Sequence, residues 1–410
     1  MGRVVVTGVG AVTPLGIGVD ACWQGLTAGR SGIRPIERFD PTGLPVQIAG
    51  EVPGFVPKEF MDLKASRRMD RFAQFAVAAS REALANAKLE ITDANRERIA
   101  AVINTGGGGI PTIETEVLTM HTKGPSRVSP FLIPLFAPNM ASSQVSITFG
   151  IRGPSITAVA ACAAGVQAFV DAVHLLERGE VDIAITGGTE AGITPVAIAG
   201  LTNMGALSRR NDAPAKASRP FDAGRDGFVF SEGSVVMILE TEEHAARRGA
   251  AAICQASGGA YTSDAFHITA PDPSGSGAAR AMSRALTRAE LAPSDVQYVA
   301  AHATATPIGD IAETTAIKQA FGDHAPHLAI SATKSMVGHM LGAAGGISSL
   351  ACVYAIRDGI VPPTINLDDP DPACDLDYVA NVARKLTVDA AAANGFGFGG
   401  QNACAIFRRI

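Results

Sequence analysis

The chain has 410 residues, enough for two or three domains of ordinary size and a large buried core. Its 34 basic and 39 acidic side chains give a formal net charge of −5, which argues against a protein that binds nucleic acid through a basic surface. Hydrophobic residues make up 47% of the sequence and charged residues 18%, and this balance excludes an intrinsically disordered chain. The composition therefore indicates a well-packed globular protein.

The elements predicted from the sequence alternate between short β-branched strands and helices. In chain order we expect strand Val4–Thr7, helix Arg67–Ala87, strands Ile99–Asn104 and Ser155–Ala158, helix Ala163–Arg178, strands Asp182–Thr186 and Val235–Glu240, helix Ser274–Ala289, strand Val296–Ala301, helix Ile308–Phe321, strand Leu328–Ser331 and helix Gly338–Arg357. This alternation predicts a layered α/β architecture.

A weak internal repeat divides the chain. Residues 155–180 give a strand, a turn that contains a cysteine, and a helix rich in small residues, and residues 329–359 give the same order with a histidine in the turn. We therefore expect two related halves, residues 1–250 and 251–410, which pack as one body because no low-complexity linker separates them.

Localisation follows from the cysteines and from the apolar segments. The six cysteines form no CxxC pair and no His/Cys cluster at zinc spacing, so we expect a reduced protein without a metal. The N-terminal segment lacks the features of a signal peptide, which favours the cytoplasm. Ser335–Ile356 contains no charged residue apart from His339, but its glycines and serines are typical of a helix buried in a globular core, so we expect no membrane contact.

Two glycine-rich segments resemble nucleotide-binding loops. Thr7–Gly10 has the first two glycines of a dinucleotide fingerprint, but it lacks the third glycine and the acidic residue that would follow, so a tight turn is the better interpretation. Gly106–Gly109 lacks the lysine and hydroxyl residue of a phosphate loop. Neither segment predicts a nucleotide cofactor.

Three residues with the chemistry for acyl transfer each follow a predicted strand. Cys162 lies among alanines at the start of a helix, where the helix dipole and free N–H groups favour a thiolate. His302 follows strand Val296–Ala301, and His339 precedes a helix in the repeated unit. A lone cysteine or histidine is usually structural, but three such residues at equivalent strand ends can converge on one site.

At this point the sequence resembles the β-ketoacyl-[acyl-carrier-protein] synthases of the elongating type, similar to synthase II of fatty-acid synthesis and to type II polyketide ketosynthases. The motifs that carry the resemblance are Val4–Gly16, Arg152–Pro154, the Cys162 turn, Ser218–Asp222, Arg225–Phe228, His302–Asp310, Lys334–Gly345, Pro362–Leu367 and Gly395–Asn402. The resemblance implies a thiolase-like fold of five αβαβα layers with two duplicated halves.

The resemblance also implies roles for named residues. Cys162 matches the nucleophile, and His302 and His339 match the pair that stabilises the enolate formed when malonyl carrier protein loses carbon dioxide. Lys334 matches a lysine that supports His339, and the N–H groups of Cys162 and Phe398 match an oxyanion hole. Further substrate contacts are implied for Thr304, Thr306, Gly107, Phe396, Gly399 and Asn402, and no cofactor is implied beyond the phosphopantetheine of the carrier.

Three residues depart from the usual pattern of these enzymes. Ala303 replaces a glycine, and we expect it to narrow the pantetheine tunnel. Ser348 replaces a glutamate that normally pairs with the lysine, which changes the ionic environment of Lys334. Gly107 replaces an apolar side chain that closes the acyl pocket, so we expect room for long, bulky or unsaturated chains.

Partners follow from charge and from the resemblance. Lys64, Arg67, Arg68 and Arg71 form a basic cluster beside the predicted helix, although such a cluster is also typical of a solvated helix face. Carrier proteins are acidic, and the resemblance implies that they dock on Lys64, Arg67 and Arg68. The resemblance implies a homodimer, or a heterodimer with a ketosynthase-like chain-length subunit.

Other functions of the same fold stay open at this point. A non-catalytic chain-length subunit would lack the nucleophile, so Cys162 and the two histidines argue against it. A thiolase acting on coenzyme A esters needs a second cysteine near the site, but Cys404 lies in a strand-like segment, which indicates core packing. The choice between fatty-acid elongation and a specialised polyketide or polyene pathway stays open.

Overall fold

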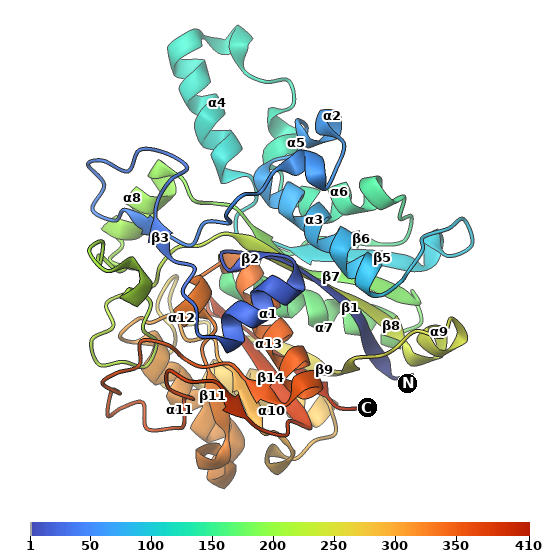
Figure 1. The fold of residues 1–410 in the computed structure, drawn as a ribbon, viewed down its shortest axis with the longest axis vertical. Helices are drawn as coiled ribbons and strands as arrows, with labels where there is room; N and C mark the ends of the chain where they lie inside the picture. Colours follow the sequence, from blue (N-terminus) through green and yellow to red (C-terminus); the bar gives the residue numbers. More distant parts are fainter. Residues whose placement is uncertain (1) are drawn as a thin grey trace.

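The computed structural model describes residues 2–410 (Figure 1). Its backbone is organised around an 11-stranded sheet in the order β11-β10-β14-β15-β9-β1-β8-β7-β5-β6, with β2 paired to β1. The strands are β1 (Val4–Thr13), β2 (Gly16–Ile17), β5 (Ile99–Asn104), β6 (Ser155–Ile156), β7 (Ile183–Glu190), β8 (Gly233–Thr241), β9 (Cys254–Ser263), β10 (Tyr298–Ala300), β11 (Ala329–Ser331), β14 (Ala390–Gly397) and β15 (Gln401–Arg408). Two small ribbons complete the strands, β3 (Arg34–Pro35) with β4 (Ile48–Ala49), and β12 (Ile360–Val361) with β13 (Arg384–Lys385).

Five layers follow from the way helices cover the two halves of this sheet. Helices α3 (Arg71–Asn86) and α6 (Met140–Phe149) cover the outer face of the first half, and α10 (Ser276–Arg288) covers the outer face of the second, with α11 (Gly309–Phe321) packed against it. Between the halves lie α7 (Ala164–Glu177) and α13 (Ala344–Asp358), which contact strands of both (Figure 1). The predicted αβαβα fold is confirmed.

The two halves meet in one continuous sheet. Strand β1 of the first half pairs with β9 of the second through Val5 and Gln255 and through Val6 and Cys254. The boundary near residue 250 stays a prediction, because a shared sheet leaves no break in the body at that point.

The internal repeat appears as two matching turns. Ala161, with φ 47°, opens the 3₁₀ turn that leads into α7, and Leu341, with φ 40°, opens the 3₁₀ turn that leads into α13. The two helices touch where a Cβ on Gly165 would lie 2.8 Å from the carbonyl oxygen of Gly342, so glycine is required there. The same backbone device therefore occurs once in each half.

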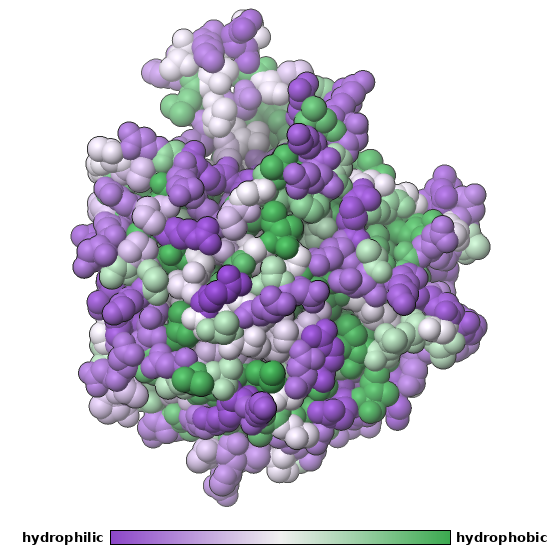
Figure 2. Space-filling view, in the orientation of Figure 1, coloured by the Kyte–Doolittle hydropathy of each residue, from purple (hydrophilic) through white to green (hydrophobic). Residues whose placement is uncertain are grey.

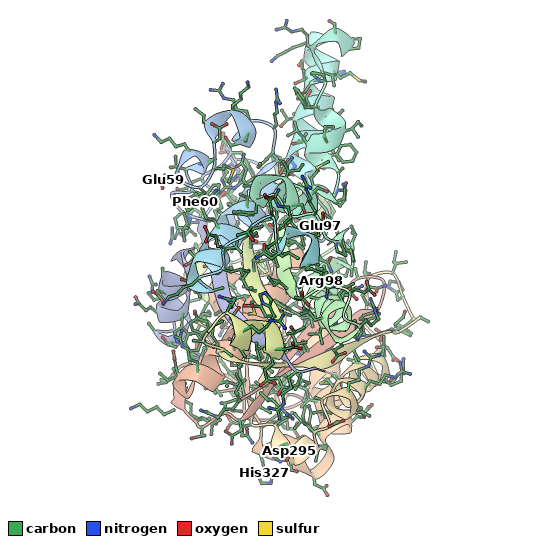
Figure 3. The ribbon with its side chains drawn as sticks, turned by 90° about the vertical axis from the view of Figure 1, so that its right-hand side faces the viewer. Glu59, Phe60, Glu97, Arg98, Asp295 and His327 are labelled. Atoms are coloured by element: carbon green, nitrogen blue, oxygen red, sulfur yellow. The ribbon has the colours of Figure 1, made fainter. Side chains whose placement is uncertain are left out.

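The remaining helices lie around this core. They are α1 (Val19–Thr27), α2 (Leu63–Ser66), α4 (Ile110–Lys123), α5 (Leu132–Phe136), α8 (Pro195–Asn203), α9 (Glu242–Arg247) and α12 (Lys334–Val337). Helix α4 stands away from the body in two perpendicular views (Figures 1 and 3), and none of its residues is buried.

Several predicted boundaries are wrong for physical reasons. The expected tight turn at Thr7–Gly10 is the interior of β1, where Gly8 and Gly10 let the backbone of α3 approach the strand closely. The expected helix Arg67–Ala87 begins at Arg71, because Asp70 caps it by accepting the N–H of Phe72. The last expected helix begins only at Ala344, after the turn that contains Leu341.

Two further differences concern the second half. Strands β9 and β14 were not expected, since their many alanines and glycines give no β-branched signal. The apolar segment Ser335–Ile356 is divided between α12 and α13, and no helix among the described residues is long and apolar enough to cross a membrane.

Candidate active site

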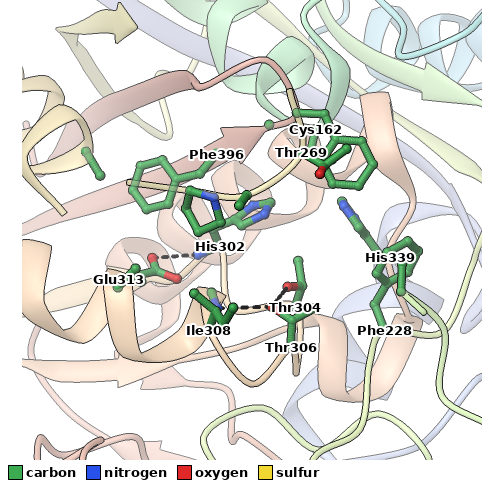
Figure 4. Close-up of a pocket in the computed structure, with 18 of the residues that line it drawn as sticks. Cys162, Phe228, Thr269, His302, Thr304, Thr306, Ile308, Glu313, His339 and Phe396 are labelled. Carbon is green, nitrogen blue, oxygen red and sulfur yellow. Dashed lines mark hydrogen bonds between the residues drawn. The ribbon is translucent and has the colours of Figure 1, made fainter. Parts of the chain in front are cut away.

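A cavity of about 330 Å³ lies at the carboxyl ends of strands from the second half and reaches the nucleophile turn of the first. Figure 4 shows the imidazoles of His302 and His339 facing the same space as Cys162. The residues that line it and that the sequence had singled out are Cys162, His302, Thr304, Thr306, His339, Phe396, Phe398 and Asn402. The structure therefore brings together side chains from positions 162 to 402.

Cys162 is a buried thiol at the start of α7, with 5% of its surface exposed. Burial raises the pKa of the thiol to about 12, while the Lys334 ammonium and the backbone N–H of Phe398 act in the opposite direction. The sequence predicts that the helix N-terminus favours a thiolate at Cys162, and burial opposes this effect on the thiol pKa. Because burial raises its pKa, the Cys162 thiol needs a base to become a nucleophile.

His302 and His339 form an edge-to-face pair. Their ring centroids are 5.5 Å apart and their planes meet at 83°. The ring of Phe228 packs 5.1 Å from His339, and the ring of Phe396 lies 5.6 Å from His302. Burial lowers the pKa of both imidazoles well below the usual value, so both are neutral at physiological pH and can each donate one N–H.

The turn after His302 is held by a buried carboxylate. Glu313 accepts the backbone N–H of His302 at 2.8 Å and that of Ala303 at 2.6 Å, and it also accepts the side-chain amide of Asn394 at 3.1 Å. Ala303 and Ala305 both have positive φ, 21° and 66°, so this turn is strained and needs such a clamp. The methyl group of Ala303 lies in the apolar core and does not line the cavity, so the expected narrowing of the tunnel is not seen.

Lys334 is a buried ammonium with 1% of its surface exposed. Burial lowers its pKa to about 8, against the opposing pull of the Glu313 and Asp310 carboxylates and of Cys162. Among the described residues, neither the Nζ atom of Lys334 nor the Oγ atom of Ser348 has a hydrogen-bond partner. The Lys334 ammonium therefore has no hydrogen-bonded carboxylate within the described part of the chain.

The turn between β14 and β15 closes the cavity beside Cys162. A Cβ on Gly397 would lie 2.9 Å from the backbone nitrogen of Cys162, so only glycine allows this approach. Phe398 follows half-buried, and Gly399 is exposed with φ 78°. Asn402 donates to the Asp264 carboxylate at 2.6 Å, which ties this turn to the loop after β9.

Thr304 and Thr306 lie on the cavity wall and Gly107 does not. The two threonine hydroxyls are 3.1 Å apart (Figure 4). A Cβ on Gly107 would lie 2.8 Å from Cδ1 of Ile110, so the isoleucine fills the space that the glycine leaves. In this structure Gly107 opens no extra room at that point.

The basic cluster of Lys64, Arg67 and Arg68 is exposed at α2 and in the link to α3. The guanidinium of Arg68 lies 5.1 Å from the ring centroid of Phe131, itself 42% exposed. The neighbouring Arg71 is not part of this surface, because it pairs with buried Glu232 at 2.7 Å.

Comparison with known proteins decides the family. Residues 1–245 match the family described as "Beta-ketoacyl synthase, N-terminal domain", and residues 253–368 match "Beta-ketoacyl synthase, C-terminal domain". The chain belongs to the β-ketoacyl synthase family. This β-ketoacyl synthase is 51% identical over 407 residues to 3-oxoacyl-[acyl-carrier-protein] synthase 2 of Synechocystis sp., covering 99% of this chain and 98% of the relative.

Solved structures agree with this family. The ishigamide ketosynthase/chain length factor superposes on this β-ketoacyl synthase with a TM-score of 0.93 at 35% identity, covering 100% of this chain and 99% of the other. A ketosynthase solved in complex with its type II polyketide acyl-carrier protein superposes with a TM-score of 0.92 at 33% identity, again covering 100% and 99%. The thiolase-like fold expected from the sequence is thereby shown.

Sequence reasoning missed three buried groups of this β-ketoacyl synthase. Glu313 follows Asp310 by three residues and so lies on the same face of α11, a spacing that could have marked both acids. Phe228 lies in a motif that the sequence did single out, but without a role. Glu190 is the last residue of β7 and the one charged residue of that strand. This position in an otherwise uncharged strand is the signal that could have marked it.

The site contains no evident place for a metal ion. Within residues 2–410, no group of three or more His, Cys, Asp or Glu side chains stands close enough together to hold one.

Proposed function

We propose that this β-ketoacyl synthase extends an acyl chain by two carbons, through a decarboxylative Claisen condensation with malonyl-acyl carrier protein. The observation that carries the proposal is that Cys162, His302 and His339 line one cavity. The relative from Synechocystis sp., which is named as an acyl-carrier-protein synthase, supports the class of substrate.

In the first step the thiol of Cys162 takes the acyl group from the carrier. A neighbouring neutral imidazole accepts the thiol proton, the sulfur attacks the thioester carbonyl, and the carrier leaves as its phosphopantetheine thiol. The backbone N–H groups of Cys162 and Phe398 receive the oxyanion, since the Phe398 N–H already faces the sulfur.

In the second step malonyl carrier protein loses carbon dioxide and forms a new carbon–carbon bond. Neutral His302 and His339 donate N–H groups to the malonyl thioester oxygen, so that the electron pair left by carbon dioxide is held as an enolate. The enolate carbon attacks the acyl carbonyl, and Cys162 is released as the leaving thiolate. The product is a β-ketoacyl carrier protein two carbons longer.

The pantetheine arm reaches this site along the polar side of the cavity. Thr304 and Thr306 supply hydroxyls for its amides, while Phe396 and Asn402 border the nucleophile end. Exposed Gly399 gives the Phe398 turn the backbone freedom to admit the acyl chain. Gly107 receives no such role, because it does not line the cavity.

The acyl carrier protein docks on Lys64, Arg67 and Arg68. These cations are exposed and would attract an acidic partner, and exposed Phe131 beside Arg68 offers an apolar contact within the same surface. The crystal structure of a ketosynthase with its carrier protein supports a protein partner of this kind.

A second copy of the chain covers the apolar edge of the first half. Strand β6 ends the sheet, and Val159 beyond it is 57% exposed, together with Val117 of α4 at 60% and Ile147 of α6 at 70%. Figure 2 shows apolar residues among polar ones on the projecting segment. Edge strands with apolar surroundings are rarely left uncovered, so we propose a homodimer here. Val159→Asp should yield monomers in sedimentation experiments, and an unchanged dimer would contradict this surface.

The alternatives are less well supported. A heterodimer with a chain-length subunit matches the neighbouring ketosynthase/chain length factor, but that protein is 35% identical, compared with 51% for the synthase 2 relative. The thiolase alternative lacks its second cysteine, because Cys404 lies fully buried in the core of β15. The cytoplasmic localisation and the absence of a resident cofactor stay predictions.

Product analysis tests the proposed reaction. The purified protein is given hexanoyl carrier protein with either malonyl carrier protein or acetyl coenzyme A, and products are identified by mass. A 3-oxooctanoyl product formed only with malonyl carrier protein supports the condensation. A product formed only from acetyl coenzyme A would favour the thiolase, and the absence of any product would favour a partner-dependent subunit.

A further inference from the structure

Glu190 is a fully buried acid that no step above uses. It ends β7, and none of its surface is exposed. Its carboxylate accepts the N–H of Gly106 at 2.7 Å, the N–H of Gly342 at 3.1 Å and the hydroxyl of Thr105 at 3.3 Å. One side chain of the first half thus holds the loop after β5 and the turn before α13 of the second half.

The two segments that Glu190 joins are in direct backbone contact. A Cβ on Gly342 would strike the backbone of Thr105 and Gly106, and a Cβ on Gly106 would lie 2.6 Å from Oε2 of Glu190. No side chain other than hydrogen fits between the carboxylate and either segment. The Glu190 carboxylate is therefore in close contact with the backbone of both segments.

The segments that meet at this junction lead directly to the reacting groups. Gly342 follows Leu341, which lines the cavity, and comes three residues after His339. On the other side, Asn104 donates to the carbonyl oxygen of Ala164 at 3.0 Å, which fixes the start of the helix behind Cys162. A shift at the junction would therefore move Cys162 and His339 relative to each other.

We infer that Glu190 is a positioning residue, whose carboxylate fixes the separation of the Cys162 and His339 turns. The inference rests on the proposed nucleophile and adds a residue to that site. Around Glu190 stand the Thr105 hydroxyl and the N–H groups of Gly106, Gly107 and Gly342. At Cys162, the Glu190 carboxylate raises the pKa of the thiol, and the Lys334 ammonium of α12 lowers it.

The titration of Glu190 makes the inference testable as a pH dependence. Burial raises its pKa to about 7, so the carboxyl is largely neutral at pH 6 and ionised at pH 8. A negative charge beside a thiol raises the pKa of that thiol, so its effect on Cys162 should appear only above pH 7.

Two variants distinguish the effect of the Glu190 charge from the effect of its side-chain length. Glu190→Gln keeps the size and removes the charge, and Glu190→Asp keeps the charge and shortens the side chain. Alkylation of Cys162 by iodoacetamide, followed by intact mass from pH 6 to pH 8.5, needs no carrier protein and so stands apart from the proposed condensation. Glu240→Gln is the matched control, because Glu240 is equally buried on β8 and binds Arg248 instead.

For Glu190→Gln we expect alkylation equal to wild type at pH 6 and about three- to tenfold faster at pH 8, which corresponds to a thiol pKa lower by up to one unit. Its kcat for condensation should fall about tenfold, because the amide of glutamine offers one acceptor oxygen where the Glu190 carboxylate offers two. Glu190→Asp should keep the wild-type alkylation profile and lose condensation. An alkylation ratio that does not change with pH, or one shared by Glu240→Gln, would overturn the inference.

Discussion

The two halves of the molecule use one backbone turn for two different purposes. In the first half the strained residue Ala161 precedes Cys162, and in the second half the strained residue Leu341 precedes Gly342. Cys162 faces the cavity, whereas Gly342 packs against the backbone of the loop after β5. The fold therefore forms the same strained turn twice, and the residue after the strained position decides whether the turn carries a nucleophile or packs against backbone.

Equivalent substitutions in the two turns should have opposite consequences. Cys162→Ala should abolish acylation and condensation while leaving the free energy of unfolding within about 1 kcal/mol of wild type, since alanine fits the same small space. Gly342→Ala should reduce stability by about 1–3 kcal/mol, because its Cβ would strike the backbone of Thr105 and Gly106. Intact mass after incubation with acyl carrier protein measures the first effect, and thermal unfolding measures the second.

Either of two results would contradict these different roles of the two turns. A stable and active Gly342→Ala variant would mean that the second turn is not closely packed. A strongly destabilised Cys162→Ala variant would mean that the cysteine is structural.

The histidines give the next largest effect. His302→Ala and His339→Ala should each lower the rate of malonyl decarboxylation about 10²–10³-fold, the usual cost of removing one donor to an oxyanion. Both variants should still acylate, since each keeps one imidazole as a base for the Cys162 thiol and the Phe398 and Cys162 N–H groups remain. The measurement is the release of carbon dioxide from malonyl carrier protein. A variant that decarboxylates as fast as wild type would contradict the assignment of that histidine.

Substitution of Lys334 should have a smaller effect, which appears only below the pKa of the lysine. Lys334→Met removes a positive charge that favours the thiolate, so alkylation of Cys162 should slow about tenfold below pH 8, equivalent to one unit in the thiol pKa. Because burial lowers the lysine pKa to about 8, the wild-type ammonium is lost above that pH and the two proteins should converge. Rates that stay equal below pH 8 would show that Lys334 does not act on Cys162.

The docking surface should give the smallest effect. Arg68→Glu should raise the KM for carrier-bound substrates about three- to tenfold with kcat unchanged, because an exposed charge acts mainly on encounter. Arg247→Glu on α9, which lies far from α2 in Figure 1, is the control for a general loss of positive charge. Equal KM values for the two variants would refute docking at Arg68.

Part of this account was available from the sequence. The family motifs single out Cys162, His302 and His339, and the structure brings all three to one cavity. The strands of β9 and β14 were missed because their side chains are mostly alanine and glycine, and small residues at that spacing give no clear strand signal.

The chemistry of the site was harder to predict than its location. The sequence suggested a thiolate at Cys162, since a helix N-terminus is a local feature, but the burial that raises the thiol pKa depends on residues from both halves. The same holds for Glu190, because its role depends on contacts with Gly106 and Gly342, which lie far apart in the sequence.

The most direct test of the central claim follows the mass of the intact protein through one turnover. The protein is incubated with carrier proteins that bear acyl chains of four to sixteen carbons, digested to locate the adduct, and then mixed with malonyl carrier protein. The account predicts an acyl adduct on Cys162 that disappears on malonyl addition, as a β-ketoacyl carrier protein two carbons longer forms. An adduct on another residue, or one that persists after malonyl addition in wild-type protein, would contradict it.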